Sequence, residues 1–373
     1  MSRFAGILRA ANQRKAFVDS AGEQLAPSDA KDLIVRTLEP FLNDHGVLDR
    51  YATSLLAVEA INVRDLRDDR WALLMLTKCL ETYRAAHRVA GDTSIRSCAY
   101  WESSVMEGLS SYWSAYHLEI PKDGLCLEEF QFELFRNIGT IIEASLKPLL
   151  RCLLSQVLMR DGEEVSCADL SKQNLGETVE YLVQRSGYRQ LFMPPPWGIR
   201  LNQWRNIADH RSSRVEEGVI VAEYGVAPKA RSIQVTRDEL LQVGRRVSSV
   251  YSAIRTARSL FLVDNMDTWQ RVTPVYPVRV EAEILNLVVG VGTQGFSVTD
   301  IRLTDCEAQM IVQEASRSDP SQRRIHASQL VVPLWVSTRR PCVRVESLEK
   351  DGTPGFRAAA RAEDCDRVTR GEL

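Results

Sequence analysis

The sequence has few of the patterns typical of metal-dependent, disulfide-rich or nucleotide-cradling proteins. Its five histidines are scattered, and its eight cysteines contain no Cys-x-x-C pair. These spacings predict neither a zinc site nor a disulfide framework. The phosphate-cradling pattern Gly-x4-Gly-Lys-Ser/Thr is also missing. We therefore expect reduced thiols in a cytoplasmic protein, with no metal and no cofactor.

The sequence also has no large excess of charge of either sign and no long uninterrupted apolar run. The formal net charge is −2 over 373 residues, so no overall positive field attracts nucleic acid. The most apolar stretch, residues 138–159, is interrupted by Glu143, Lys147 and Arg151. We therefore expect no transmembrane helix and no membrane partner. A hydrophobic content of 45% is enough for two or three packed domains.

What the sequence does contain is helical periodicity, which predicts a mainly α protein. Apolar residues recur every three or four positions through most of the first 265 residues. Residues 1–120 are expected to form a helical N-terminal region. One predicted helix begins at Pro27 and runs through Phe41. Three more cover residues 47–61, 71–89 and 100–116.

Residues 125–265 are predicted to form an antiparallel helical bundle. Thr236 and Glu239 have the spacing of a capping box, which predicts a helix starting there and running to about Val263. The remaining expected elements are a long helix over 127–159 kinked at Pro148, helices over 167–186 and 201–217, and a β-hairpin near 218–235 with strands over 218–224 and 230–235.

The C-terminal part has a different character. Residues 270–347 are predicted to form a small α+β domain, and the polar residues 348–373 are predicted to be disordered. Within the small domain we expect strands over 275–291, 296–303 and 329–336 and a helix over 305–315.

The segment Trp204–His210 carries the chemistry. Side chains four residues apart share one face of a helix, which gives a polar stripe of Asn202, Asn206, His210 and Arg214. The opposite, apolar side is expected to contain Leu201, Trp204, Ala208 and Val215. Arg205 lies on the flank of the stripe, well away in angle from His210.

These side-chain types suit RNA cleavage without a metal. RNA supplies its own nucleophile, the 2′-hydroxyl, so the protein must supply a base, an acid and positive charge on the phosphate. An imidazole titrates near neutrality, so His210 can act as base or acid. The guanidinium of Arg205 can hold two phosphate oxygens, and Asn206 can orient the histidine. Asn202, Arg211 and Arg214 are candidate RNA contacts.

A structural interpretation competes with this one. Arg205 and Asp209 are four residues apart and can form an ordinary helix ion pair, which would leave His210 as a surface residue. A local basic patch for RNA would have to come from arginines around the motif. The candidates are Arg200, Arg205, Arg211, Arg214, Arg245, Arg246, Arg255 and Arg258.

The motif Arg205-Asn206-x3-His210, with the hairpin and capped helix that follow it, resembles the HEPN family. The resemblance covers residues 125–265. It implies a helical bundle that acts as a homodimer, with Arg205 and His210 as the catalytic pair and Asn206 in support. It also implies a metal-independent endoribonuclease of a toxin or antiviral-defence system, with an optional regulatory protein partner. Some members carry a tyrosine two residues after the histidine, where this chain has Ser212, which disfavours control by modification of that tyrosine.

Two other functions remain open at this point. The helical body can be a non-catalytic interaction scaffold in which His210 has no chemical role. Alternatively, the HEPN-like region can bind a nucleotide signal without cutting RNA.

Overall fold

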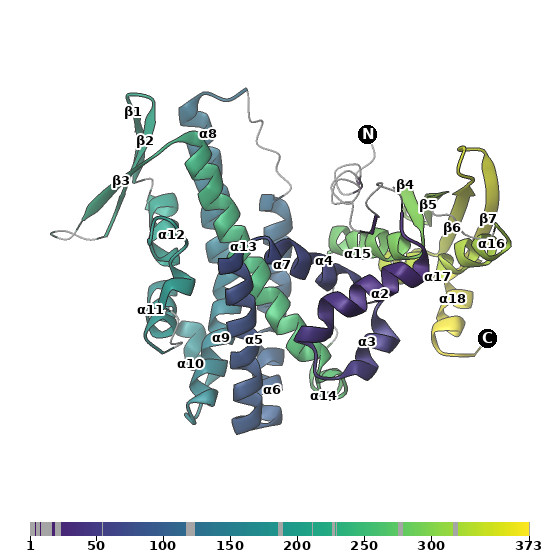
Figure 1. The fold of residues 1–373 in the computed structure, drawn as a ribbon, viewed down its shortest axis with the longest axis horizontal. Helices are drawn as coiled ribbons and strands as arrows, with labels where there is room; N and C mark the ends of the chain where they lie inside the picture. The colour runs from purple at the N-terminus through teal and green to yellow at the C-terminus, as the bar shows by residue number, and fades with distance from the viewer. Residues whose placement is uncertain are drawn as a thin grey trace. The chain divides into compact units, whose positions relative to one another are not determined.

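The computed structural model describes Phe4, Leu8, Phe17, Val18 and residues 24–372, apart from 54, 117–123, 186–188, 211, 226–227, 229, 275–278 and 316–319. Over these residues the chain is mainly helical with a small C-terminal sheet, which confirms the predicted fold class at that level. The chain forms two compact units (Figure 1). One is Asn62–Pro277, and the other combines Met1–Ile61 with Val278–Leu373.

Three long helices form the centre of the unit Asn62–Pro277. Helices α5 (Arg70–Ala90), α9 (Lys147–Arg160) and α13 (Arg237–Val263) lie side by side (Figure 1). Tyr83 on α5 stacks on Phe261 of α13 with ring centroids 5.4 Å apart. The apolar positions that the spacing predicts for α13 are all buried, because they recur every three or four residues on the face that meets α5. They are Leu240, Val243, Val247, Val250, Ile254, Ala257 and Phe261. Further helices of this unit are α6 (Asp92–Tyr100), α7 (Glu102–Tyr116) and α14 (Met266–Val272).

The segment before Pro148 differs from the predicted kinked helix. Helix α8 (Leu127–Thr140) leads into a π-helical segment, η2 (Ile141–Leu146), and α9 follows directly. Pro148 has no N–H to offer the turn before it, and a wider turn accommodates that loss within a continuous helix. Gly108 of α7 lies against η2, where an added Cβ would come within 2.8 Å of the Ala144 carbonyl oxygen. The π-helical segment therefore packs tightly, and it carries Glu143.

The remainder of this unit surrounds the candidate motif. Helix α12 (Leu201–His210) packs on α8 and is followed by a three-stranded antiparallel sheet. Thr236 then begins α13 with the predicted capping box, in which its N–H donates to Glu239 Oε2 at 2.7 Å. Two elements replace the helix predicted over 167–186, because Asn174 and Glu177 cap a second helix start with reciprocal 2.9 Å hydrogen bonds. The two replacing elements are α10 (Cys167–Lys172) and α11 (Leu175–Arg185). The other elements around the motif are η3 (Arg189–Phe192), β1 (Ser213–Glu216), β2 (Val219–Tyr224) and β3 (Arg231–Val235).

The other unit is built on a four-stranded mixed sheet in the order β4-β5-β6-β7. Strands β5 and β6 are parallel, so the chain crosses over between them through two helices. The strands are β4 (Phe296–Leu303), β5 (Glu307–Glu314), β6 (Cys342–Leu348) and β7 (Pro354–Arg361). The helices are α2 (Pro27–Leu38), η1 (Glu39–Phe41), α3 (His45–Tyr51), α15 (Val280–Thr293), α16 (Pro320–Gln329), α17 (Val331–Thr338) and α18 (Ala362–Thr369).

Several element predictions in this unit were wrong. The run predicted as a strand over 275–291 forms helix α15 from Val280 onward, and its residues 275–278 lie outside the described part of the chain. The strand predicted over 329–336 is largely helix α17. The helix predicted over 305–315 is strand β5. The tail over 348–373 is ordered into β7 and α18. The helix predicted over 47–61 divides into α3 and α4 (Ala57–Arg67). In the unit Asn62–Pro277, the helix predicted over 100–116 begins only after Trp101.

Candidate functional site

Helix α12 holds the motif because one of its sides is fully apolar. Leu201, Trp204 and Ile207 are buried at successive three-residue steps and face α8. Trp204 also meets the Trp197 ring edge-on, with centroids 5.9 Å apart. Gly139 of α8 allows this close approach, since an added Cβ there would lie 3.1 Å from the Ala208 Cβ. The two helices therefore fix the direction in which the polar side of α12 points.

The predicted polar stripe ends earlier than expected. We predicted that residues 211–217 finish the helix, but α12 ends at His210 and β1 begins at Ser213. The backbone N–H of Ser212 donates to the Ile207 carbonyl at 3.2 Å, which closes the last turn. Arg214 therefore leaves the stripe and lies on β1, where Nη1 is 2.6 Å from Glu223 Oε1. Val215 is likewise on β1 and not on the buried face of the helix, and Arg211 lies outside the described residues.

Arg205 is held by two carboxylates of its own chain. Its Nε is 2.8 Å from Glu143 Oε2 and 3.2 Å from Asp209 Oδ2. Its Nη1 donates to Asn206 Oδ1 at 3.2 Å. The ion pair expected from the structural interpretation is therefore present, together with a second pair from η2 that the sequence did not reveal. We call Arg205, Glu143, Asp209 and Lys147 the Arg205 cluster.

Lys147 completes this cluster from the start of α9. Its ammonium pairs with Glu143 Oε1 four residues earlier. Partial burial works against ionisation of Glu143, but the hydrogen bonds from Lys147 and Arg205 outweigh it and lower the pKa of Glu143. Glu143 is therefore an anion at neutral pH, and its charge holds both cations. A spacing of four between Glu143 and Lys147 is visible in the sequence, but nothing there connects either residue with Arg205.

His210 occupies the last position of α12 and is exposed. Among the described residues, none forms a hydrogen bond or an ion pair with its imidazole. It is five positions from Arg205 along the chain, which corresponds to about 140° around the helix axis. The two side chains therefore leave α12 in different directions. A phosphate that contacts both side chains needs a second copy of the motif or a bend of the long arginine side chain.

The two asparagines of the motif differ in their roles. Asn206 accepts a hydrogen bond from Arg205 and so takes part in positioning the guanidinium. Asn202, one turn earlier, is half-buried, and its Oδ1 has no hydrogen-bond partner in the described part of the chain. The Oδ1 of Asn202 is therefore out of contact with solvent, although the side chain as a whole is only half-buried.

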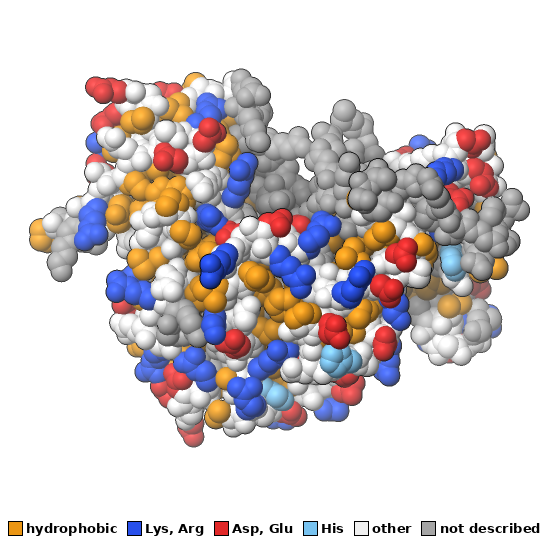
Figure 2. Space-filling model, in the orientation of Figure 1, with side chains coloured by type: hydrophobic (Ala, Val, Ile, Leu, Met, Phe, Trp, Pro, Cys, Tyr) orange, Lys and Arg blue, Asp and Glu red, His pale blue; other side chains and the backbone are white. Residues whose placement is uncertain are grey.

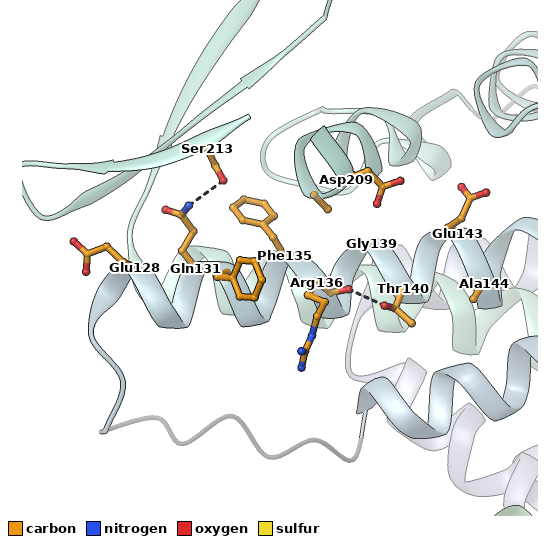
Figure 3. A pocket seen from close by; sticks show the side chains of 12 residues that line it. Glu128, Gln131, Phe135, Arg136, Gly139, Thr140, Glu143, Ala144, Asp209 and Ser213 are labelled. Carbon is orange, nitrogen blue, oxygen red and sulfur yellow. Dashed lines mark hydrogen bonds between the residues drawn. The ribbon is translucent and has the colours of Figure 1, made fainter. Parts of the chain in front are cut away.

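A cavity of about 690 Å³ opens beside the motif. Its lining comes from α8, η2, the end of α12 and the start of β1 (Figure 3). Glu143 and Asp209 of the Arg205 cluster lie at one end of it, and Gln131 Nε2 donates to Ser213 Oγ at 3.0 Å at the other. Two phenylalanines of α8, Phe132 and Phe135, belong to the wall. Sequence reasoning missed this cavity because its residues come from three separate stretches.

The arginines proposed as a basic patch are largely paired. Arg258 is buried and binds Glu102, and Arg246 pairs with Asp69. Arg200 pairs with Glu180 beside the entrance of α12. On the face drawn in Figure 2, basic and acidic side chains are interspersed over the described surface. Arg205 and Lys147 are themselves paired with Glu143, so most of the described cations named here already have a carboxylate partner.

In the described part of the chain, no helix combines the length and the apolar character needed to span a membrane. No group of three or more His, Cys, Asp or Glu side chains converges with metal-binding geometry in those residues. Comparison of the chain with protein-family models, with curated proteins and with solved structures finds no match in any of the three.

Proposed function

We propose that the chain is a metal-independent endoribonuclease of HEPN type. The observation that carries the proposal is an exposed imidazole, His210, at the end of the helix that also holds Arg205 beside an open cavity. Acid–base groups must reach the substrate before their pKa matters, and exposure of the His210 side chain supports the proposal on that point. The proposed family assignment rests on the motif and on the order of helix, hairpin and capped helix after it.

The proposed reaction uses the RNA 2′-hydroxyl as nucleophile. His210 accepts its proton as the oxygen attacks the adjacent phosphorus, and the bond from phosphorus to the 5′-oxygen breaks. The leaving oxygen takes a proton from a second imidazole, which gives a 2′,3′-cyclic phosphate and a 5′-hydroxyl. Arg205 stabilises the negative charge that develops on the phosphoryl oxygens.

This scheme calls for two copies of the motif. One chain offers a single imidazole at the site, and about 140° separates it from Arg205 around α12. A symmetric dimer brings the same surface of two chains together, so two helices can present two histidines and two arginines to one strand. In each copy the phosphate must displace Glu143 and Asp209 from Arg205, and this competition weakens RNA binding in the resting state. A toxin or antiviral-defence role follows from the resemblance alone, as does a regulatory partner.

A second candidate function is that of a non-catalytic interaction protein. It is favoured by the ion pairs of Arg205, since both carboxylates already satisfy the guanidinium. In that case His210 is a solvated helix end. Binding of a nucleotide signal without cleavage is a variant of this candidate, and calorimetric titration with nucleotides tests it.

RNA cleavage in EDTA separates these functions. We expect the wild-type chain to cut RNA, and His210→Ala to lose roughly 10²- to 10⁴-fold in rate. His45→Ala is the matched control, because His45 is also exposed but lies in the other unit. Arg205→Ala is compared with Arg200→Ala, whose guanidinium pairs with Glu180 outside the motif. Equal cutting by wild type and His210→Ala, with both folded by circular dichroism, would refute the proposal.

A further inference from the structure

The cavity beside the Arg205 cluster has the size of a small-molecule site. Its volume of about 690 Å³ falls within the range of roughly 300–1,000 Å³ that is usual for ligand pockets. One wall is a single face of α8, where Glu128, Phe132, Phe135 and Gly139 recur at spacings of three and four. The end of α12 forms the opposite wall (Figure 3). The cavity therefore has room for one nucleotide next to the motif.

The α8 wall presents aromatic surface. Phe132 is 48% exposed, although a phenyl ring gains by burial, and Phe135 on the same wall is buried. A phenyl ring offers a flat apolar face on which any base can stack. This observation favours a planar apolar ligand and does not by itself distinguish one base from another.

The charges of the lining residues distinguish one base from another. Three carboxylates line the cavity, those of Glu128, Glu143 and Asp209. Arg136 also belongs to the lining, but it pairs with Glu133 and its guanidinium points away from α12 in Figure 3. Glu143 and Asp209 also pair with Arg205 or Lys147, but neither cation belongs to the lining. The wall itself therefore presents acceptor oxygens, which attract N–H donors rather than a phosphate. A bound strand would therefore keep its phosphate outside the cavity, near Arg205 and His210, and insert the base.

Asp209 is the carboxylate best placed to receive those donors. Its Oδ2 faces Arg205, whereas its Oδ1 lies over Gly139 at the floor of the cavity, 3.2 Å from where an alanine Cβ would be. Any larger residue at position 139 would therefore crowd this oxygen. An ionised carboxylate has about four acceptor sites on its two oxygens, so Asp209 can hold Arg205 with one of them and still accept two N–H donors from a ligand.

We propose that this cavity binds a nucleobase of the RNA strand and prefers guanine, an inference that rests on the proposed ribonuclease function. Guanine presents two parallel N–H donors, from N1 and the 2-amino group, which match a carboxylate. Adenine and cytosine each present only an amino group. Uracil turns carbonyl oxygens toward the carboxylates on either side of its single N–H, so it binds least well.

Binding to uncleavable oligonucleotides tests this proposal separately from cleavage. The full chain is titrated into labelled pentanucleotides that are 2′-O-methylated throughout and carry G, A, C or U at the centre of a uridine background. Fluorescence anisotropy is expected to give about 10-fold tighter binding for the G-centred than for the all-uridine strand. Phe132→Ala is expected to weaken binding of the G-centred strand roughly 5- to 100-fold. Tyr181→Ala, which removes a similarly exposed aromatic residue on α11, is expected to leave it unchanged.

Asp209→Asn provides the specificity readout. An amide can accept only one of the two guanine donors, so the ratio of G-centred to all-uridine affinity should fall to about twofold or less. Equal affinity for all four strands, or a Phe132→Ala chain that binds the G-centred strand like wild type, would overturn the base pocket. Tighter binding of a triarginine peptide than of any strand would assign the carboxylates to a protein partner and overturn it as well.

Cleavage in EDTA by the same preparations separates this inference from the proposed function. If the wild type cuts RNA with no base preference at the cut, the base-pocket proposal is overturned, whereas the proposed ribonuclease function is supported. If the G-centred strand is preferred and Phe132→Ala abolishes that preference while no RNA is cut, the nuclease is overturned and the base pocket is supported.

Discussion

Glu143→Gln is the substitution that probes the Arg205 cluster most cleanly. Glutamine keeps the shape of the side chain but removes the charge that holds Arg205 and Lys147. Charge-assisted hydrogen bonds contribute about 1.5–3 kcal/mol each when they are buried. The Glu143 side chain is 34% exposed, so screening by water reduces this contribution substantially. We expect a loss of roughly 1–2 kcal/mol in the free energy of unfolding.

The pH dependence of that loss has a defined sign. The folded state lowers the pKa of Glu143, so ionised Glu143 stabilises the fold at every pH above its unfolded pKa of about 4.3. The stabilisation disappears as pH falls from about 4.3 through the lower folded-state pKa, because protonation removes the charge. The difference in unfolding free energy between wild type and Glu143→Gln is therefore full at pH 7 and shrinks toward zero in acid.

Urea denaturation followed by circular dichroism from pH 7 to pH 3 measures both effects. Glu180→Gln serves as the matched control, because Glu180 also pairs with one arginine but its side chain is 41% exposed. We expect about 0.5 kcal/mol or less for that change. A Glu143→Gln chain as stable as wild type at pH 7, or a deficit that persists undiminished at pH 3, would refute the role assigned to Glu143.

Three further predictions concern the motif helix, the buried core and the dimer. Gly139→Ala is expected to cost about 1–3 kcal/mol in unfolding free energy by overpacking the junction of α8 and α12; unchanged urea denaturation would contradict that packing. Glu102→Gln leaves a buried guanidinium without its anion and is expected to cost about 3–5 kcal/mol, whereas Asp169→Asn removes an exposed pair with no measurable effect; similar midpoints for both would contradict the buried pair. In the proposed dimer, mixing inactive Arg205→Ala and His210→Ala chains is expected to restore part of the RNA cleavage, and complete inactivity of the mixture would argue against a shared site.

The sequence predicted the motif region well because its signals are local. The capping box at Thr236, the hairpin strands and the buried stripe of α13 depend on residues close together in the chain, and all are present. The end of α12 was misplaced because polar residues 211–217 continue the four-residue spacing without a breaker before Gly218. The strand β1 is defined by its pairing with β2, which is a tertiary property.

The C-terminal unit shows where local signals fail. Helix α15 is rich in valine, which favours strands, yet its burial follows helical spacing through Ile284, Leu287, Val288 and Val291. Strand β5 has the alternating buried residues Ala308, Met310 and Val312, and that alternation indicated a strand over the segment we predicted as helical. In both segments the periodicity of the buried residues was a better guide than composition.

The sequence predicted the motif residues of the candidate site but not the residues that pack against them. Arg205, Asn206 and His210 come from one short motif, and the pair between Arg205 and Asp209 follows from helical spacing. Glu143 lies 62 residues away on a π-helical segment, so its contact with Arg205 depends on how α8 and α12 pack. The cavity depends on the same packing, which no periodicity in the sequence specifies.

The central claim is that RNA is cut by its own 2′-hydroxyl with help from His210, and one measurement addresses it directly. A DNA strand that contains a single ribonucleotide is incubated with the wild-type chain in EDTA, and the product ends are identified by mass spectrometry. The proposal predicts one cut, 3′ to the ribose, that leaves a 2′,3′-cyclic phosphate and a 5′-hydroxyl, and it predicts the loss of that cut in His210→Ala but not in His45→Ala. An intact strand, cuts at deoxyribose positions, or 5′-phosphate ends would contradict it.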